Sequence, residues 1–321
     1  MGFIARRLII TFITLFMVSL LTFTAFRFIP GDPALLSLGT EATEEQIQAL
    51  RAEMGLERSL PLQYVSWLRN LVTGQLGYSA RFSGVPVSDL IFPRIPVTLS
   101  LAALSLLFIL LIAVPVSFLS VKKENSFASR IVTAFTALGV SIPGFFLALL
   151  FVWIFGIVLK LFVPGSYVSF QENPAAFFLY LVFPALAIAL PNAALLVKFL
   201  RTSIFKELQK DYVRTARSKG GSRSHILGKH VFKNASLPAI TLLGMITGEI
   251  LSGSIVIEQV FGIPGIGRLL IASITARDYL LTETLVIYIA FAVILANTLA
   301  DIVLQLVDPR IRLWEKERSA V

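Results

Sequence analysis

Polar and charged side chains that could bind a ligand or take part in catalysis are concentrated in one stretch, DYVRTARSKGGSRSHILGKH, at residues 211–230. Its glycines and the Gly228–Lys229 pair suggest a phosphate-binding loop, in which backbone N–H groups and a lysine hold phosphate oxygens. Such a loop has a glycine five residues before the glycine–lysine pair, where this chain has Arg223. It also has a serine or threonine after the lysine, where this chain has His230. The stretch is therefore not a nucleotide-binding loop.

Catalysis and metal binding find little support elsewhere in the chain. There is no cysteine, which excludes disulfides, zinc–thiolate sites and cysteine nucleophiles. His225 and His230 are the two histidines, too few for a histidine-built metal site. The HExxH and GxSxG patterns of peptidases and hydrolases are missing, and the carboxylates are scattered among loops. An intramembrane hydrolase therefore has little support.

One carboxylate, Glu249, lies about 12 residues into an apolar run. An ionised group there would cost a few kcal/mol if it faced lipid, so Glu249 should face the bundle interior or water. Its neighbours are small or polar and suit tight helix packing: Gly248, Ser252, Gly253 and Ser254. Two interpretations stay open, a carboxyl hydrogen-bonded between helices or a contact for a cationic group in a translocation path that Ser252 would also line.

The composition indicates an integral membrane protein. Of 321 residues, 56% are hydrophobic and only 15% are charged, and the mean hydropathy is +0.82. Spanning the hydrocarbon takes about 20 apolar residues, and six runs have that length. We expect an all-α polytopic fold with spans near Leu8–Phe28, Thr98–Val121, Ile131–Leu161, Phe177–Leu200, Leu237–Ile257 and Thr282–Leu306, with kinks at Pro143, Pro184 and Pro191.

Orientation follows from the lysines and arginines, because basic residues near helix ends favour the cytoplasmic side. The segment Lys198–Ser236 carries ten basic residues against two acidic ones, and Arg6, Arg7, Lys122 and Lys123 fall on the same side as this segment. Both termini and the polar stretch are therefore predicted to be cytoplasmic. The first run is too long for a signal peptide and is expected to be a retained helix.

Residues 29–97 would then be extracytoplasmic, and they carry helical signals. Thr43 and Gln46 form a predicted capping box before a run that stops at Gly55. Pro61 opens a second run that ends before Gly74 and has one apolar face, formed by Tyr64, Val65, Leu68, Leu71 and Val72. The two helices either cover the mouth of the bundle or form a docking surface for an external partner.

The polar stretch itself predicts two helices that meet at Gly220 and Gly221, because apolar residues recur at helical spacing on both sides. A polybasic patch that contacts anionic lipids would explain the charge. It does not explain the glycines, the alanine and the apolar spacing. A protein-docking element, set across the membrane surface, explains all of these features.

The chain contains RTARSKG at residues 214–220, which is followed by Ile226, His230, Asn234 and Leu237–Pro238. This pattern resembles the EAA loop of permease subunits in binding-protein-dependent ABC importers. The family's leading glutamate is Arg214 here and its first alanine is Thr215, departures that resemble the peptide-transporter branch. Three further stretches resemble that branch over nearly the whole chain, namely FRFIPGDP (26–33), LPLQYVSWLRNLVTGQLGYS (60–79) and IEQVFGIPGIGRLL (257–270) with Arg277-Asp278-Tyr279. Leu280 stands where a proline is expected.

The resemblance implies the first of two permease subunits in the dipeptide, oligopeptide and nickel group, with a type-1 ABC importer permease fold in the bacterial inner membrane. Its partners would be a second permease subunit, two cytoplasmic ATPases that bind ATP and magnesium, and an extracytoplasmic solute-binding protein. No cofactor would be bound by this chain, and nucleic acid is not expected. The cargo would be di- or oligopeptides, with nickel or glutathione-like cargo as alternatives and an ion-driven secondary transporter as a less favoured class.

The implied organisation has four parts: a first span at 1–28, an extracytoplasmic region at 29–97, a five-helix core at 98–308 and a tail at 309–321. The core would contain a coupling loop at 201–236, with a short helix around residues 216–225 that an ATPase grips. The residues assigned to this contact are Arg214, Thr215, Ala216, Arg217, Ser218, Lys219, Gly220, Gly221 and His225. Glu249 and Ser252 are the residues assigned to the path.

Overall fold

The computed structural model describes residues 2–28, 33–38, 42–53, 55–82, 84–122 and 126–307. Within these ranges the secondary structure is helical, and the only strand-like pairing is an isolated antiparallel bridge between Tyr78 and Pro86. The all-α prediction is therefore confirmed for the described residues. The predicted tail at 309–321 and residues 29–32 of the FRFIPGDP stretch lie outside them.

In the described part of the chain, five helices are long and apolar enough to cross a membrane: α1 (Gly2–Phe28), α6 (Ile95–Lys122), α9 (Pro174–Leu208), α13 (Leu237–Phe261) and α15 (Tyr279–Val307). A helix satisfies all of its backbone hydrogen bonds internally, which is the condition for crossing hydrocarbon. A bent helix pair brings the number to six if the pair is counted as one span. The chain is thus a multi-pass membrane protein by the length and composition of its helices.

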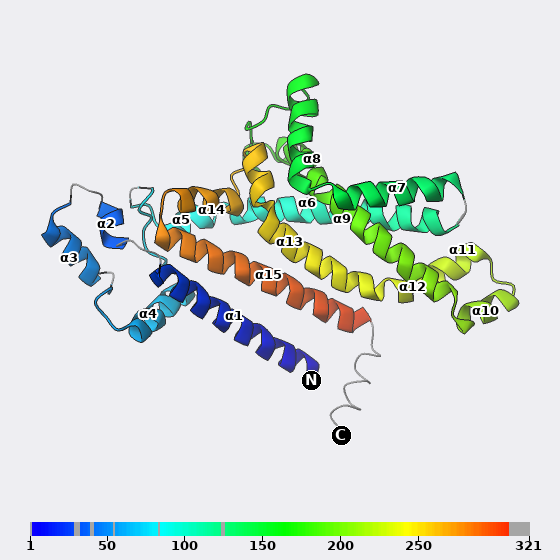
Figure 1. Ribbon diagram of the computed structural model, residues 1–321, viewed down its shortest axis with the longest axis horizontal. Helices are drawn as coiled ribbons and strands as arrows, with labels where there is room; N and C mark the ends of the chain where they lie inside the picture. Colours follow the sequence, from blue (N-terminus) through cyan, green and yellow to red (C-terminus); the bar gives the residue numbers. More distant parts are fainter. Residues whose placement is uncertain are drawn as a thin grey trace.

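The third predicted span is not one helix. Residues 131–161 form α7 (Phe127–Ser141), α8 (Gly144–Phe151) and the π-helical η1 (Val152–Val158), with a 97° bend between the two halves. Pro143 has no backbone N–H and disfavours helical geometry at the residue before it, and Ile142 is extended. Figure 1 shows α8 standing away from α7. Pro184 and Pro191, by contrast, lie inside α9, which runs without a break.

The core of the bundle is built on α9, which packs against α6, α7, α8 and α13. Its buried face is rich in alanine, which lets neighbouring backbones approach closely in the absence of a hydrophobic driving force between helices. Glycine has the same role between α13 and α15, where a Cβ on Gly244 would lie 2.4 Å from the Cβ of Ala300. Tight helix contacts therefore stabilise the centre of the bundle.

The first helix, α1, lies at the rim against α15, and most of its large apolar side chains are exposed. Arg7 forms an ion pair with Asp301, and the hydroxyls of Thr11 and Thr298 are 2.9 Å apart. The ion pair places Asp301 at the contact between α1 and α15.

Residues 33–91 form short helices at one end of the bundle: α2 (Pro33–Leu38), α3 (Glu44–Glu53), α4 (Leu60–Thr73) and α5 (Val87–Ile91). The capping box is confirmed, since the N–H of Thr43 donates to Gln46 Oε1 at 3.0 Å and the N–H of Gln46 to Thr43 Oγ1 at 3.4 Å. The predicted second helix is confirmed as α4, and on its apolar face Val65 and Val72 are exposed. Tyr64 of that face and Trp67 beside it lie toward α1, where both rings pack against Phe23.

The two ends of the bundle carry different elements (Figure 1). One end, here called the α14 end, holds α2 to α5 and α14 (Ile266–Thr275). The other, here called the α10 end, holds α10 (Asp211–Ser218), α11 (Arg223–Ile226), η2 (Leu227–Val231) and α12 (Phe232–Ala235). The long helices connect the two ends.

Candidate functional site

The polar stretch forms a helix–turn–helix at the α10 end, with α10 before the turn and α11, η2 and α12 after it. Two helices meeting at Gly220 and Gly221 were predicted, and this is confirmed. A single short helix around residues 216–225 was also expected, and this is wrong, because the turn falls inside that range. All nine residues assigned to the ATPase contact therefore lie on α10, on α11 or in the turn between them.

Hydrogen bonds define the turn as a Schellman motif, in which a left-handed residue ends a helix. Gly220 has φ +82°, and its N–H donates to the carbonyl of Arg217 at 2.9 Å. The N–H of Gly221 donates to the carbonyl of Ala216 at 3.2 Å. A Cβ on Gly221 would lie 3.0 Å from that carbonyl oxygen and 3.1 Å from Ile226 Cγ1. A glycine is thus needed at position 220 because the backbone there is left-handed. A glycine is needed at position 221 because there is no room for a side chain.

A small apolar cluster fastens the helix–turn–helix to the ends of α6 and α9. Its fully buried members include Val213 and Val231 from this element, Val121 from α6 and Ile204 from α9. Arg223 adds a polar contact, donating through Nη2 to the carbonyl of Val121 at 3.1 Å. Because both long helices contribute to the cluster, movement of the helix–turn–helix would be transmitted to α6 and α9 together.

Tyr212 joins the two arms of the element. Its hydroxyl lies 2.7 Å from Glu207 Oε2, at the end of α9, and accepts from Asn234 Nδ2 of α12 at 3.3 Å. Burial raises the pKa of the Tyr212 phenol, and its contact with the Glu207 carboxylate acts in the same direction. The phenol therefore stays neutral, and its hydroxyl donates a hydrogen bond to the Glu207 carboxylate.

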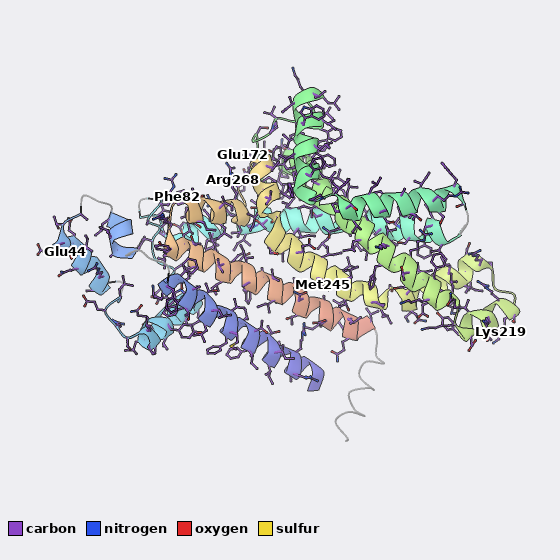
Figure 2. The ribbon with its side chains drawn as sticks, viewed as in Figure 1. Glu44, Phe82, Glu172, Lys219, Met245 and Arg268 are labelled. Carbon is purple, nitrogen blue, oxygen red and sulfur yellow. The ribbon has the colours of Figure 1, made fainter. Side chains whose placement is uncertain are left out.

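The outer surface of the element is polar and mostly basic. Seven of the nine assigned residues are exposed, namely Arg214, Thr215, Arg217, Ser218, Lys219, Gly220 and His225, whereas Ala216 and Gly221 are half-buried. Arg214 Nη1 lies 3.7 Å from Asp211 Oδ1 on the same helix. Figure 2 shows Lys219 at the tip of the α10 end. The surface can accept a partner that presents carboxylates.

The two residues assigned to the translocation path, Glu249 and Ser252, have different surroundings in the structure. Glu249 is exposed and lines a cavity of about 330 Å³ beside the α7–α8 bend, together with Gly144, Pro191 and Asn192. Ser252 does not line this cavity, and its hydroxyl donates to the carbonyl of Gly248 at 3.0 Å. No hydrogen bond joins the Glu249 carboxyl to another described residue.

An exposed stripe of α13 continues from Glu249 in both directions. Its members recur every three or four residues and are Met245, Glu249, Ser252, Gly253, Val256 and Gln259. This spacing places them on one face of the helix. The face runs along α13 from Met245, which Figure 2 labels near the middle of the molecule, toward the α14 end.

A buried polar junction at the α14 end was missed by the sequence reasoning. Thr98 of α6 donates to Glu258 Oε1 of α13 at 2.8 Å, and the N–H of Arg268 in α14 donates to Glu258 Oε2 at 3.0 Å. The N–H of Ile266 donates to Thr98 Oγ1 at 2.9 Å. Glu258 thus holds the start of α14 against α6. The GIPGIG segment that follows the glutamate is the signal that could have indicated it.

Asp278 makes a similar junction, at the start of α15. Its carboxylate accepts from the Ser79 hydroxyl, from the N–H of Arg81 at 3.1 Å and from the N–H of Leu281 at 3.2 Å. The first two bonds hold the loop between α4 and α5, and the third caps α15. Among the described residues no group of three or more His, Cys, Asp or Glu could hold a metal ion.

The fold and these two ends define a multi-pass membrane protein with an exposed basic helix–turn–helix. Residues 113–313 match the family model for the inner membrane component of binding-protein-dependent transport systems, and residues 1–102 match the model for the N-terminal part of that membrane component. The chain belongs to this family. The predicted identity as a permease subunit of a binding-protein-dependent ABC importer is therefore confirmed.

Curated relatives match over nearly their full length. A probable peptide ABC transporter permease protein of Sinorhizobium fredii is 34% identical over 310 residues, 97% of this chain and 99% of the relative. A putative peptide transport system permease protein of Brucella abortus is 37% identical over 295 residues, 92% and 94% of the two chains. The oligopeptide transport system permease protein AppB of Bacillus subtilis is 33% identical over 312 residues, 97% and 99%.

Proposed function

We propose that this chain forms half of the translocation path of a peptide-importing ABC transporter, and that α10 to α12 couple ATP hydrolysis on separate subunits to opening and closing of the path. The observation that carries the proposal is the helix–turn–helix itself, which is exposed and basic outside but fastened by Val213 and Val231 to α6 and α9. The peptide cargo is inferred from the printed names of the relatives. Nickel or glutathione-like cargo is the alternative.

The proposed topology has both termini and the α10 end in the cytoplasm. The start of α1 and the end of α15 lie toward the same end of the bundle as α12 (Figure 1). The basic residues Arg6 and Arg7 therefore lie on the same side as the basic helix–turn–helix, as the positive-inside tendency favours. The α14 end, with α2 to α5, is then extracytoplasmic and available to a solute-binding protein.

Coupling would operate through the cluster that joins the helix–turn–helix to the long helices. Closure of two ATPases would displace α10 and α11, and Val121 and Ile204 would carry the displacement into α6 and α9. Arg217 and Lys219 would pair with carboxylates of the ATPase, and Ala216 and the two glycines would permit close backbone approach. The ATP and magnesium would be bound by the ATPases and not by this chain.

The proposed path follows the exposed stripe of α13. Glu249 is the carboxylate on this stripe, and a free carboxylate beside a cavity suits a peptide ammonium group. This favours the cargo-contact interpretation of Glu249 over the packing interpretation. Ser252 would contribute only to the surface of the stripe.

The test is reconstitution in lipid vesicles. The chain alone should be inactive, and ATP-dependent peptide uptake should appear only when a second permease subunit, two ATPases and a binding protein are added. Uptake by the isolated chain driven by an ion gradient would instead indicate a secondary transporter. Competition of the labelled peptide with nickel complexes and glutathione would decide among the cargo classes.

A further inference from the structure

Two adjoining cavities at the α14 end are lined by three arginines. One, of about 200 Å³, is lined by Arg94, Arg268 and Phe82. The other, of about 620 Å³, is lined by Arg81, Arg268 and Gln259. The two share Arg268 and Ala272, and no aspartate or glutamate of the described ranges lines either cavity. Figure 2 shows Phe82 and Arg268 at the end of the molecule opposite Lys219.

The guanidinium groups of these arginines are oriented but not neutralised. Arg94 donates to the carbonyl of Leu90, and Arg268 Nη1 donates to the carbonyl of Gly262 at 2.7 Å. None of the three forms an ion pair within the described part of the chain. A guanidinium has five N–H donors, so each retains donors for a ligand.

The carboxylates of Glu258 and Asp278, which lie nearby, already accept hydrogen bonds from other groups. Glu258 accepts from the Thr98 hydroxyl and from the N–H of Arg268, and Asp278 accepts from Ser79 and from the N–H of Arg81. These contacts use the backbone of the arginines and leave the guanidinium groups without a counterion. Arg268 lines both cavities, with Arg81 in the larger and Arg94 in the smaller, so like charges face each other in each cavity, and a bound anion would offset their repulsion.

The geometry points to a carboxylate as the anion, since the planar guanidinium fork matches carboxylate oxygens in pairs. Gln259, which lines the larger cavity, also ends the exposed stripe of α13 that contains Glu249. These two residues are ten positions apart, about 15 Å along the helix. An extended peptide of about five residues has that length. One face of α13 thus leads from a recess of positive charge to a single negative charge, which suits a peptide with free termini.

We propose that Arg81, Arg94 and Arg268 bind the α-carboxylate of the peptide as it enters the path. The proposal rests on the proposed peptide import function and adds a carboxylate-binding site to it. The competing occupant is an acidic side chain of the binding protein. The peptide is favoured because the smaller cavity is a recess beside half-buried Arg94, and because Gln259 of the larger cavity ends the stripe that carries Glu249.

The experiment uses the assembled transporter in nanodiscs without its binding protein. A radiolabelled pentapeptide with a photoreactive side chain is supplied either as the free acid or as the C-terminal amide, and crosslinks are mapped by mass spectrometry. The free acid should label residues near α14 at least fivefold more than the amide. Arg268→Gln and Arg81→Gln should each reduce this ratio to below twofold, because both side chains are exposed and their loss leaves the core intact.

Arg277→Gln is the matched control, since Arg277 is another exposed arginine at the α14 end that lines neither cavity. It should keep the wild-type ratio. Equal labelling by the acid and the amide, or no labelling, would overturn the carboxylate site. So would a loss in Arg268→Gln of binding-protein affinity with an unchanged labelling ratio. ATP-dependent uptake by the complete wild-type transporter, measured in parallel, tests the import function separately.

Discussion

The carboxylate of Glu258 lies directly against Gly265, so that a Cβ on Gly265 would be 2.3 Å from the carboxyl carbon. The contact joins the end of α13 to the start of α14, and the same carboxylate binds Thr98 of α6. The packing of α6, α13 and α14 at this junction therefore requires that Gly265 has no side chain.

Replacing Gly265 should destabilise this junction. Gly265→Ala forces the buried carboxylate to move and should lower the stability of the purified chain by about 1–3 kcal/mol, as overpacking does in other cores. Thermal unfolding in detergent would measure the change. Gly253→Ala is the control, because no atom lies within 4 Å of its Cβ position, and it should leave the melting temperature unchanged or raise it. Equal melting of both variants would contradict the crowding at Gly265.

Changes in the turn of the helix–turn–helix should uncouple transport without affecting insertion. Gly220→Val places a β-branched residue at φ +82°, with a strain on the order of 1–3 kcal/mol. Gly221→Val clashes with Ala216 and Ile226. Both variants should reach the membrane at normal levels and lose ATP-dependent uptake. Gly228→Ala, which has open space around its Cβ, is the control. Normal uptake by both valine variants would remove the docking role.

Tyr212→Phe should loosen the joint between α9 and α12. The variant loses the bonds to Glu207 and Asn234, at a cost of about 1 kcal/mol, but keeps the ring in place. We expect ATP hydrolysis to continue while the number of peptides imported per ATP falls. Tyr78→Phe, at an exposed position, should keep the wild-type ratio. An unchanged ratio in Tyr212→Phe would show that this joint does not contribute to coupling.

Glu249→Gln tests the path. If the carboxylate contacts the peptide ammonium group, its loss removes a charge-assisted contact of about 1.5 kcal/mol, and the KM for uptake should rise about tenfold. Glu172→Gln, an exposed change in the loop before α9, serves as the matched control. Wild-type kinetics in Glu249→Gln would restrict this residue to helix packing.

Local signals predicted much of this structure. The capping box at Thr43, the turn at Gly220 and most spans follow from residue types within a few positions of each other. The 97° bend was not predicted, because Pro143 indicates a kink but the angle depends on what α7 and α8 pack against. The hydrogen bond between Thr98 and Glu258 could not be predicted from local signals either, because the two residues are 160 positions apart in the sequence. The side of α4 that packs against α1 was not predicted, because it depends on the contact of Tyr64 and Trp67 with Phe23, which is distant in sequence.

The contact between Thr11 and Thr298 has a consequence for biosynthesis. These residues are 287 positions apart, and a ribosome adding about 5–20 residues per second needs about 15–60 s to make the intervening chain. During that interval the first helix resides in the bilayer before its neighbour on α15 exists. The exposed apolar side chains of α1 can be solvated by lipid acyl chains during this time. Arg7 can form its ion pair with Asp301 only after α15 has been made. The bundle can close at its rim only after α15 has been translated.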